Sequence, residues 1–379
     1  MAQVALVSCD NYDLARVMVA LRQSLDLLGG LAGIIKPGER VLIKVSMLRA
    51  AKPAEAVTTH PMVAVGLALL VREIGATPVI GDSCGGADYG LSEPALIETG
   101  IKPLADAHGI ETVLFETAGS VKTPVVNGKF LQEIPVSKAV LAADAIISVP
   151  KLKTHIETLM TGAVKNMLGC LPGAGKLIIH RTAPSPYDLG QALLDIYGTV
   201  RPRLCVMDGI VAMSGNGPSR GVPQKVGVVL AATDGVALDH VAARLIGYQP
   251  RLIPTIAGAK ERGLGETDEA AIEILGGKLA DLKAVDFALC SNTMMRAMPK
   301  FLLRILNRWF FTVRPEWNDA GCIRCGLCER SCPVGAIVIA DDKLTIDRKK
   351  CIDCFCCFEL CPEKGIKVRK SLLARILSG

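Results

Sequence analysis

The chain has 379 residues, of which 50% are hydrophobic and only 4% aromatic, and its formal net charge is +6. This length is too great for one small domain, and the composition is typical of α/β proteins rich in Ala, Val, Ile and Leu. The positive charge is modest and no stripe of basic and aromatic residues accompanies it. The composition therefore argues against a nucleic acid as partner.

The amino-terminal residues do not resemble a secretory signal. No basic segment precedes an apolar stretch in residues 1–10, and apolar windows such as 63–71 are too short to span a bilayer. Nine of the fourteen cysteines crowd into residues 322–361 with the spacing of metal ligands. Because metal-binding thiols persist in a reducing compartment, we expect a soluble, cytoplasmic protein.

Short β-branched runs alternate with helical patterns along residues 1–290. The expected strands are 4–8, 41–45, 77–81, 112–115, 145–149, 204–207 and 226–231. The expected helices are 13–28, 61–74, 92–108, 187–197 and 235–246. This alternation predicts right-handed βαβ units, so we expect an α/β body built on a mostly parallel sheet, with ligands bound beyond the carboxyl ends of its strands.

Polar residues gather where five of these strands are expected to end. They are Lys44 with Ser46, Asp82 with Ser83, the segment 151–155, Asp208, and Thr233 with Asp234. Taken together they predict one shared substrate site. Taken singly, each also fits a turn or a helix cap, and Asp234 before Gly235 is typical of an N-cap.

Cationic residues are densest between positions 150 and 181. They are Lys151, Lys153, His155, Lys165, Lys176, His180 and Arg181. Thr161 and Lys165 are four residues apart, which predicts that they share one helical face. This cluster favours a small anionic substrate. We expect His155 and His180 to donate protons, with Asp208 or Asp239 orienting or recharging them; the alternative is surface histidines and lysines that are merely solvated.

Two segments look like nucleotide-binding loops but lack essential residues. In 169–176 the first glycine is one position too far from Lys176, and Leu177 replaces the hydroxyl that binds magnesium. The segment 81–86 follows an expected strand but lacks G-x-G-x-x-G. Neither a nucleoside triphosphate nor a dinucleotide is predicted, and the sequence does not decide whether a flavin binds.

The segment 291–318 has the periodicity of an amphipathic helix. Arg296, Lys300, Arg304 and Arg308 recur every four residues opposite apolar side chains. We expect this helix to clamp the carboxy-terminal part of the chain onto the body. The alternatives are a helix that lies on a membrane surface and a homodimer face.

Two copies of C-x2-C-x2-C-x3-C-P, the run found in bacterial ferredoxins, occupy residues 322–333 and 351–362. The segments 336–340 and 344–346 between them are expected as short strands. The double run with both Cys-Pro ends predicts two 4Fe-4S clusters in an α+β ferredoxin-like domain at 319–379. The alternative is zinc, which paired CxxC motifs also bind.

The resemblance to bacterial ferredoxins implies that each cluster takes three cysteines from one run and the fourth from the other. One ligand set would then be Cys322, Cys325, Cys328 and Cys361, and the other Cys351, Cys354, Cys357 and Cys332. Cys356 is not used in this assignment.

The body resembles the family called domain of unknown function 362. The resemblance covers essentially the whole chain and rests on the segment 150–169, on 215–218 (Gly-Asn-Gly-Pro) and on 234–239 (Asp-Gly-Val-Ala-Leu-Asp). Segments 59–61 and 81–83 also match, whereas Lys44-Val45-Ser46 stands where the family pattern has Lys-Pro-Asn. The resemblance implies functional positions at Lys44, His155, Lys165, Asn166, His180, Asp208, Asn216 and Asp239.

These observations predict an iron–sulfur oxidoreductase whose ferredoxin-like domain passes low-potential electrons to an anionic substrate in the body, for a proton-coupled reduction. The expected electron donor is a ferredoxin or flavodoxin. The expected catalytic residues are His155, Lys165, His180, Asp208 and Asp239. The expected substrate-binding residues are Lys44, Ser46, Asp82, Ser83, Lys153, Thr161, Asn166 and Asn216. The alternatives are a non-enzymatic electron carrier or adaptor, and an isomerase-type enzyme with structural clusters.

Overall fold

The structure is a computed structural model of the whole chain. It describes residues 1–84, 92–172, 176, 179, 182–183, 185–219, 221–282, 286–291, 313–330, 332, 335–341, 343–351, 357, 361, 363 and 365–370. Expected features outside these ranges, among them His180 and most of the expected connecting helix, lie outside the described residues.

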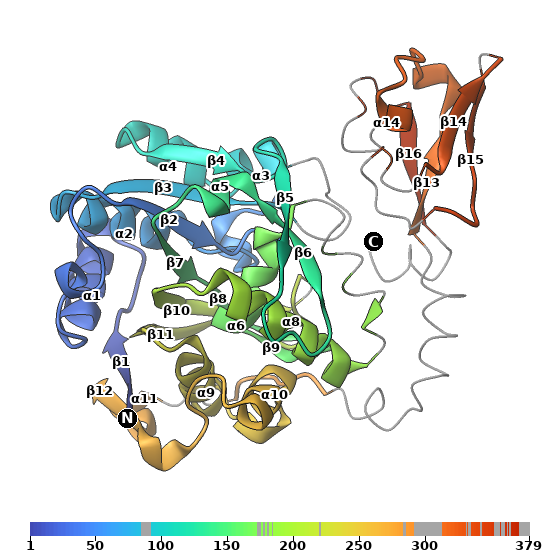
Figure 1. Cartoon of the computed structure of the whole chain (residues 1–379). Helices are drawn as coiled ribbons and strands as arrows, with labels where there is room; N and C mark the ends of the chain where they lie inside the picture. Colours follow the sequence, from blue (N-terminus) through green and yellow to red (C-terminus); the bar gives the residue numbers. More distant parts are fainter. Residues whose placement is uncertain are drawn as a thin grey trace.

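The described part of the body alternates strands with helices (Figure 1). Its strands are β1 (Ala2–Ser8), β2 (Arg40–Val45), β3 (Thr77–Asp82), β4 (Glu111–Leu114), β5 (Ser120–Pro124), β6 (Glu133–Ser137), β7 (Ala145–Val149), β8 (Lys151–His155), β9 (Leu159–Thr161), β10 (Leu204–Ser214), β11 (Val222–Ala232) and β12 (Ile272–Gly276). Its α-helices are α1 (Leu14–Asp26), α2 (Pro61–Glu73), α3 (Ser92–Glu98), α4 (Ile101–Ala107), α5 (Lys138–Leu141), α6 (Ala163–Asn166), α8 (Pro186–Val200), α9 (Gly235–Leu245), α10 (Pro254–Arg262) and α11 (Leu279–Leu282). Short 3-10 helices occur as η1 (Leu31–Gly33), η2 (Pro53–Glu55), η3 (Met167–Cys170), η4 (Pro250–Leu252) and η5 (Glu269–Ala271).

A ten-stranded sheet forms the centre of the body, in the order β12-β1-β11-β10-β7-β2-β3-β4, with β8 and β9 attached beside β10. The pairs β1–β12, β10–β7, β2–β7, β2–β3 and β3–β4 are parallel. Strand β11 runs antiparallel to both of its neighbours. The expectation of a mostly parallel α/β sheet is therefore confirmed.

Helices cover both faces of the sheet. Successive residues of a strand point to opposite faces, so alternate residues of one strand pack against different helices. In β1, Ala5 and Val7 belong to the core cluster formed with α1 and α2, whereas Val4 and Leu6 belong to the cluster formed with α9. Such strands read as continuous apolar runs, as expected for parallel sheets buried on both faces.

Side-chain caps start several of these helices. The carboxylate of Asp13 accepts a hydrogen bond from the backbone N–H of Arg16 at the start of α1, and Asp234 accepts from Val236 and Ala237 at the start of α9. The expected N-cap role of Asp234 is thus confirmed.

Three expectations about elements of the body are wrong. The expected helix 92–108 is two helices, because Gly100 adopts a φ of 74° between them. Asp208 lies inside β10 and not after its end. Thr161 ends strand β9 whereas Lys165 lies on α6, so the two residues do not share a helical face.

The small carboxy-terminal part has two antiparallel strand pairs: β13 (Val313–Trp317) with β16 (Ile366–Lys370), and β14 (Ile337–Ala340) with β15 (Lys343–Ile346). The 3-10 helix η6 (Asp319–Gly321) and the helix α14 (Leu327–Arg330) lie between β13 and β14 in the sequence. The expected strands of the ferredoxin-like domain are present. Residues 313–317, expected as the end of the connecting helix, form β13 instead, so this domain begins before residue 319.

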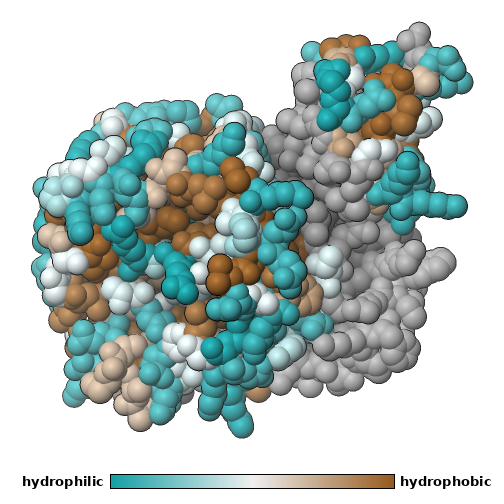
Figure 2. Space-filling view, viewed as in Figure 1, coloured by the Kyte–Doolittle hydropathy of each residue, from teal (hydrophilic) through white to brown (hydrophobic). Residues whose placement is uncertain are grey.

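No helix among the described residues is long and apolar enough to cross a membrane. On the face of the body shown in Figure 2, hydrophobic surface lies over α5 and the β5–β6 hairpin, amid hydrophilic surface. Val121, Val126 and Leu141 are among the exposed apolar residues of these elements and the turn between them.

Candidate functional site

Strand β8 points a row of basic side chains to one side of the sheet. Residues 151, 153 and 155 alternate with Leu152, which is part of the hydrophobic core, and Thr154, whose hydroxyl donates to the Gly215 carbonyl at 2.8 Å. Because side chains alternate along a strand, Lys151, Lys153 and His155 share the opposite face. All three are buried.

Lys44 and Asp82 form a buried ion pair across adjacent strands. The Lys44 ammonium lies 2.9 Å from Oδ1 of Asp82, and both side chains are 2% exposed. The ammonium also donates to Oδ1 of Asn166 at 2.9 Å and to the Val45 carbonyl at 2.7 Å. The Asn166 amide donates in turn to Ser148 Oγ and to the Lys44 carbonyl, both at 3.1 Å. The structure thus brings together three residues expected in one substrate site.

Lys176 reaches the end of β3 from a segment far along the chain. Its buried ammonium donates to the carbonyl of Ser83 at 2.5 Å, to the Ser83 hydroxyl and to the carbonyl of Cys84 at 2.8 Å. The Ser83 hydroxyl donates to the Gly169 carbonyl at 2.9 Å. Ser83 therefore binds a lysine side chain of the same chain.

Lys153 and Lys165 are ammonium groups without a carboxylate partner in the described part of the chain. Lys153 donates to the Val57 carbonyl at 2.7 Å, and no hydrogen bond or ion pair is found for the Lys165 ammonium among the described residues. Burial, reinforced by repulsion from Lys165, Lys151 and Lys44, lowers the pKa of Lys153 to about 7. Burial also lowers the pKa of Lys165 to about 8, against the opposing attraction of Glu157. Both groups change charge near neutral pH.

Thr161 places a buried hydroxyl beside this cluster. It is paired with Lys153 across the antiparallel β8–β9 ladder, so the two side chains lie on the same face. Its Oγ1 is buried and has no hydrogen-bond partner within the described part of the chain. A buried hydroxyl without a partner is unusual, and a bound ligand would supply the missing bond.

His155 ends β8 and is 6% exposed. Its Nδ1 accepts hydrogen bonds from the backbone N–H groups of Glu157 at 3.1 Å and Thr158 at 3.3 Å. In the neutral ring this leaves the proton on Nε2. These two hydrogen bonds fix the orientation of the ring at the end of β8.

Asp208 is fully engaged inside the body. Its Oδ2 accepts from the Lys151 ammonium and the His60 backbone N–H, both at 2.9 Å, and its Oδ1 accepts from the Tyr12 hydroxyl at 2.8 Å. The Lys151 ammonium also donates to the Tyr12 hydroxyl at 2.7 Å, and the His60 ring stacks on Tyr12 with 3.5 Å between centroids. Asp208 thus connects the segments that carry Tyr12 and His60 to strand β8, and both of its oxygens already accept hydrogen bonds.

Sequence reasoning missed Tyr12 as a member of this network. A signal was present, because the polar segment Asp10-Asn11-Tyr12 directly follows the expected first strand. The polar residues after the first strand therefore belong with those that follow the other strands.

Asp239 supports helix α6 and does not face the lysines. Its carboxylate accepts from the backbone N–H of Ala163 at 2.6 Å and of Val164 at 3.1 Å. Burial raises the pKa of Asp239 to about 7, although these two hydrogen bonds act in the opposite direction. The residue positions the helix that carries Lys165 and Asn166.

The remaining expected site residues are spread out. Ser46 is buried, and its backbone N–H donates to the Thr59 hydroxyl at 2.8 Å. Asn216 is exposed in the turn after β10. Thr233 and Asp234 follow β11, which runs antiparallel to its neighbours, so the end of this strand lies at the opposite edge of the sheet and not at the shared site.

In the carboxy-terminal domain, four of the expected ligands surround one cavity. Cys322, Cys325, Cys328 and Cys361 line it together with Arg324, Ile339 and Leu344. The Gly365 N–H donates to Cys361 Sγ, and the Ala336 N–H donates to Cys332 Sγ, each at 3.1 Å. Four thiols around one space, with an N–H bond to one of them, fit a 4Fe-4S cluster, whose sulfurs commonly accept hydrogen bonds. Of the second set, Cys332, Cys351 and Cys357 are described and Cys354 is not.

The architecture defines a class of protein: an α/β body on a mostly parallel sheet, followed by a ferredoxin-like 4Fe-4S domain. Comparison with known families agrees with this division. The profile of the domain of unknown function DUF362 matches residues 41–244, and that of the 4Fe-4S dicluster domain matches residues 321–365. The chain belongs to the DUF362 family and carries a ferredoxin-like iron–sulfur domain.

Three relatives and one solved structure are similar to parts of the chain. A thylakoid-associated protein of Synechocystis is 35% identical over 265 residues, which are 70% of this chain and 80% of that protein. A component of an ion-translocating oxidoreductase complex of Methanosarcina acetivorans is 43% identical over 51 residues, 14% of this chain and 19% of that protein. A ferredoxin-like protein in the nif region of Sinorhizobium fredii is 46% identical over 39 residues, 10% and 61% respectively. The lactate racemase apoprotein of Thermoanaerobacterium thermosaccharolyticum is similar over 65% of this chain and 57% of that chain, with a TM-score of 0.41 and 10% identity.

Proposed function

We propose that the protein is an iron–sulfur oxidoreductase that reduces a small anionic substrate held in the α/β body. The observation that carries the proposal is a surplus of largely buried positive charge near the carboxyl ends of the parallel strands. Five lysines lie there: Lys44, Lys151, Lys153, Lys165 and Lys176. Burial is the main cause of the lowered pKa values of Lys153 and Lys165, and repulsion from the other lysines adds to it. Two of them form ion pairs, with Asp82 and Asp208.

The other three lysines lack a carboxylate within ion-pair distance in the described part of the chain. Lys153 and Lys176 are 2% and 5% exposed, and Lys165 is half-buried. Burying an unpaired ammonium opposes folding, and removing the proton or binding an anion relieves that cost. A ligand with two or three negative charges would balance this group of lysines.

The residues around the bound anion have different roles in the proposed reaction. Lys153 and Lys165 attract the anion, and the Thr161 hydroxyl donates a hydrogen bond to it. His155 delivers a proton from Nε2 to the atom that is reduced. Asp239 fixes α6, and the Asp208–Lys151–Tyr12 network holds β8 in place.

A second group of expected residues completes the proposed site. Lys44, Asp82 and Asn166 hold the carboxyl ends of β2 and β3 against α6, Ser83 bonds Gly169 of η3, and Ser46 follows β2. His180 and Asn216 stay in the proposal on sequence grounds alone.

The ferredoxin-like domain would supply the electrons. When bound, 4Fe-4S clusters transfer single electrons at low potential. We assign one cluster to Cys322, Cys325, Cys328 and Cys361, which line one cavity, and a second to Cys332, Cys351, Cys354 and Cys357. A ferredoxin or flavodoxin would reduce them, and reduction of the substrate by two electrons would consume two protons.

The test uses the full chain purified without oxygen. Small molecules released from the wild-type protein are identified by mass spectrometry and compared with those from the double variant Lys153→Met/Lys165→Met. We expect an anion that is enriched in the wild type and lost from the variant. Adding that anion to dithionite-reduced protein should reoxidise the clusters.

His155→Gln is the second arm of this test. We expect reoxidation by the anion to slow by about 10²-fold to 10⁴-fold, with iron content and reduction by dithionite unchanged. Conversion of the anion without a reductant would overturn the proposal in favour of an isomerase. Absence of any specifically bound anion would instead favour an electron carrier or adaptor.

A further inference from the structure

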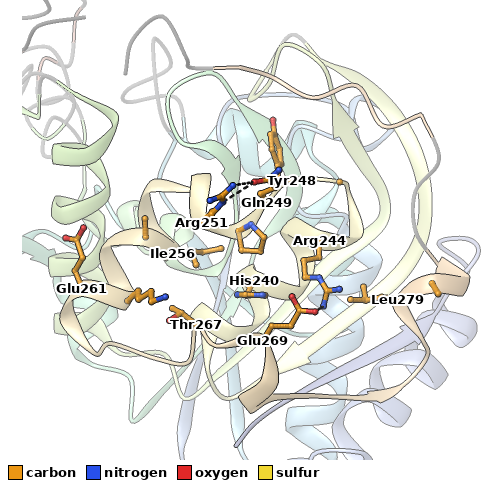
Figure 3. A pocket seen from close by; sticks show the side chains of 15 residues that line it. His240, Arg244, Tyr248, Gln249, Arg251, Ile256, Glu261, Thr267, Glu269 and Leu279 are labelled. Carbon is orange, nitrogen blue, oxygen red and sulfur yellow. Dashed lines mark hydrogen bonds and ion pairs between the residues drawn. The ribbon is translucent and has the colours of Figure 1, made fainter. Parts of the chain in front are cut away.

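A pocket of about 940 Å³ lies on the helices of the body, away from the lysine cluster (Figure 3). It is formed by the second half of α9, by η4 and α10, and by residues 267, 269, 279 and 280. None of the residues assigned above to the substrate site lines it. The pocket is therefore a separate cavity.

His240 occupies the centre of this pocket (Figure 3). It follows Asp239 on α9, but whereas Asp239 bonds α6, the imidazole of His240 lines the pocket. The residue is 6% exposed, and neither ring nitrogen has a hydrogen-bond partner among the residues that the structure describes. Burying two unsatisfied polar atoms costs stability that an apolar residue would not lose.

A ligand could provide the missing partner without moving the helix. A half-turn of the imidazole about χ2 exchanges its nitrogens with its carbons, so one nitrogen can be turned towards the pocket. Burial lowers the pKa of His240, with the carboxylate of Glu269 acting in the opposite direction. The neutral ring offers one donor and one acceptor.

The side chains that line the pocket include three cations, Arg244, Arg251 and Lys260, and two acids, Glu261 and Glu269. Arg251 is held by the Oε1 of Gln249 through two hydrogen bonds of 3.1 and 2.9 Å, and Lys260 is exposed; neither forms an ion pair among the described residues. Arg244 is neutralised by Glu269 at 2.6 Å. The remaining acid, Glu261, accepts a hydrogen bond from the Tyr187 hydroxyl at 2.7 Å. Arg251 and Lys260 are therefore the cations of this pocket that form no ion pair with a carboxylate among the described residues.

Apolar side chains complete the wall. Tyr248, Pro250, Ile256, Ala257 and Leu279 line the same pocket. An arginine fork suits the planar or tetrahedral oxygens of a carboxylate or phosphate, and the apolar wall suits a hydrocarbon or aromatic body. We propose that this pocket binds a small organic anion, with its acidic group at Arg251 and Lys260, a hydrogen bond to His240, and its apolar body against Ile256 and Leu279.

The experiment is isothermal titration of the anaerobically prepared full chain with phenyl phosphate and with benzoate. These probes distinguish a phosphate from a carboxylate head group. Inorganic phosphate and phenol serve as the fragments of phenyl phosphate, and formate and benzene as those of benzoate. We expect at least one aromatic anion to bind about tenfold more tightly than its fragments. The double variant Arg251→Gln/Lys260→Gln should weaken this binding by about tenfold or more, because charge-assisted hydrogen bonds are lost.

Two control variants test whether cations outside this pocket contribute to binding of the probe. Lys225→Gln, an exposed lysine on β11 outside the pocket, should leave binding unchanged. Lys153→Met/Lys165→Met, which alters the substrate site, should also leave it unchanged. Binding that survives in the Arg251/Lys260 variant, or that is lost in the Lys153/Lys165 variant, overturns the proposal. So does the absence of binding of both probes at about 10 mM.

His240→Leu gives an independent readout. Leucine has no polar atoms to leave unsatisfied in the ligand-free pocket. We therefore expect the replacement to raise the midpoint of thermal unfolding of the ligand-free chain by about 2–4 °C. The same variant should lose most of its affinity for the probe. If the variant is stabilised and still binds the probe with wild-type affinity, His240 does not take part in ligand binding.

Discussion

The ammonium of Lys44 lies 2.9 Å from the carboxylate of Asp82, and both groups are almost completely removed from solvent. The pair joins β2 to the end of β3, and Asn166 connects it to α6. Two residues that are 38 positions apart in the sequence thereby define the edge of the candidate substrate site.

The Lys44–Asp82 pair should be important for stability. Replacing Asp82 by Asn leaves a buried ammonium without its counter-charge, so we expect the free energy of unfolding to fall by about 3–5 kcal/mol. Anaerobic urea unfolding of the full chain, followed by circular dichroism, measures this loss. The matched control is Asp106→Asn, which breaks an exposed pair with Lys102 and should cost about 0.5 kcal/mol or less. Equal losses in the free energy of unfolding for the two substitutions would show that the buried pair stabilises the fold no more than the exposed pair does.

Anion binding in the substrate site should weaken as the pH rises. The folded pKa values of Lys153 and Lys165 are about 7 and about 8, below the ordinary value of 10.5, so these groups are charged at lower pH and lose their protons through this range. With sulfate as probe, we expect affinity to fall by about tenfold or more between pH 6 and pH 9.

Titration calorimetry of two variants checks the cause of this pH dependence. Lys153→Met should bind sulfate more weakly and with a flatter pH profile, because one titrating ammonium is gone. Lys225→Met should retain the wild-type profile, since Lys225 is an exposed residue of β11. A profile that is unchanged in Lys153→Met would assign the pH dependence to other groups.

Tyr12 should stabilise the body through its hydroxyl. Replacing it by Phe removes the donor to Asp208 and the acceptor for Lys151 and the Val211 N–H, which lie within 2.7–3.0 Å. We expect a loss of about 1–3 kcal/mol in the free energy of unfolding, because buried partners are left unsatisfied. The control Tyr187→Phe removes a hydroxyl from an exposed side chain and should change stability by about 0.5 kcal/mol or less. A Tyr12→Phe variant as stable as the wild type would contradict the importance of this network.

The cysteine assignment predicts the iron content of variants. The wild-type chain should bind about eight iron and eight sulfide ions, and Cys361→Ser should lose about half of each, because Cys361 lines the cavity with Cys322, Cys325 and Cys328. Cys356→Ser should keep the full content, since only Cys357 preserves the three-residue spacing to Cys361. Iron and sulfide analysis with electron paramagnetic resonance of the reduced protein tests both. Tightly bound zinc in place of iron would refute the assignment.

The alternation of strands and helices was predictable because it depends on local patterns. Apolar runs such as 4–8 and 41–45 and caps such as Asp234 are properties of neighbouring residues, and the structure confirms them. The missed elements depend on distant partners. Residues 313–317 contain a proline and charged residues, and they form a strand only because 366–370 pair with them.

The candidate site residues also combine a local feature, which the sequence reveals, with a feature that depends on distant segments. A polar residue at the end of a strand is visible in the sequence, but its role depends on the direction of that strand. Asp82 reaches the site because β3 is parallel to β2, whereas Asp234 does not, because β11 is antiparallel to its neighbours. Asp208 and Asp239 are acids of similar appearance in the sequence, yet one accepts bonds from Lys151 and Tyr12 and the other from the backbone of α6.

The sequence alone determined that the chain has an α/β body and a ferredoxin-like domain with closely spaced cysteines, because periodicity and ligand spacing are local properties. Only the tertiary structure decided which charges are compensated. Lys44 and Lys151 each meet a carboxylate from another strand, whereas Lys153 and Lys165 do not among the residues that the structure describes. The physical reason is that ion pairing and burial depend on the packing of segments that are far apart in the sequence, and this packing also leaves His240 without a hydrogen-bond partner in the described part of the chain.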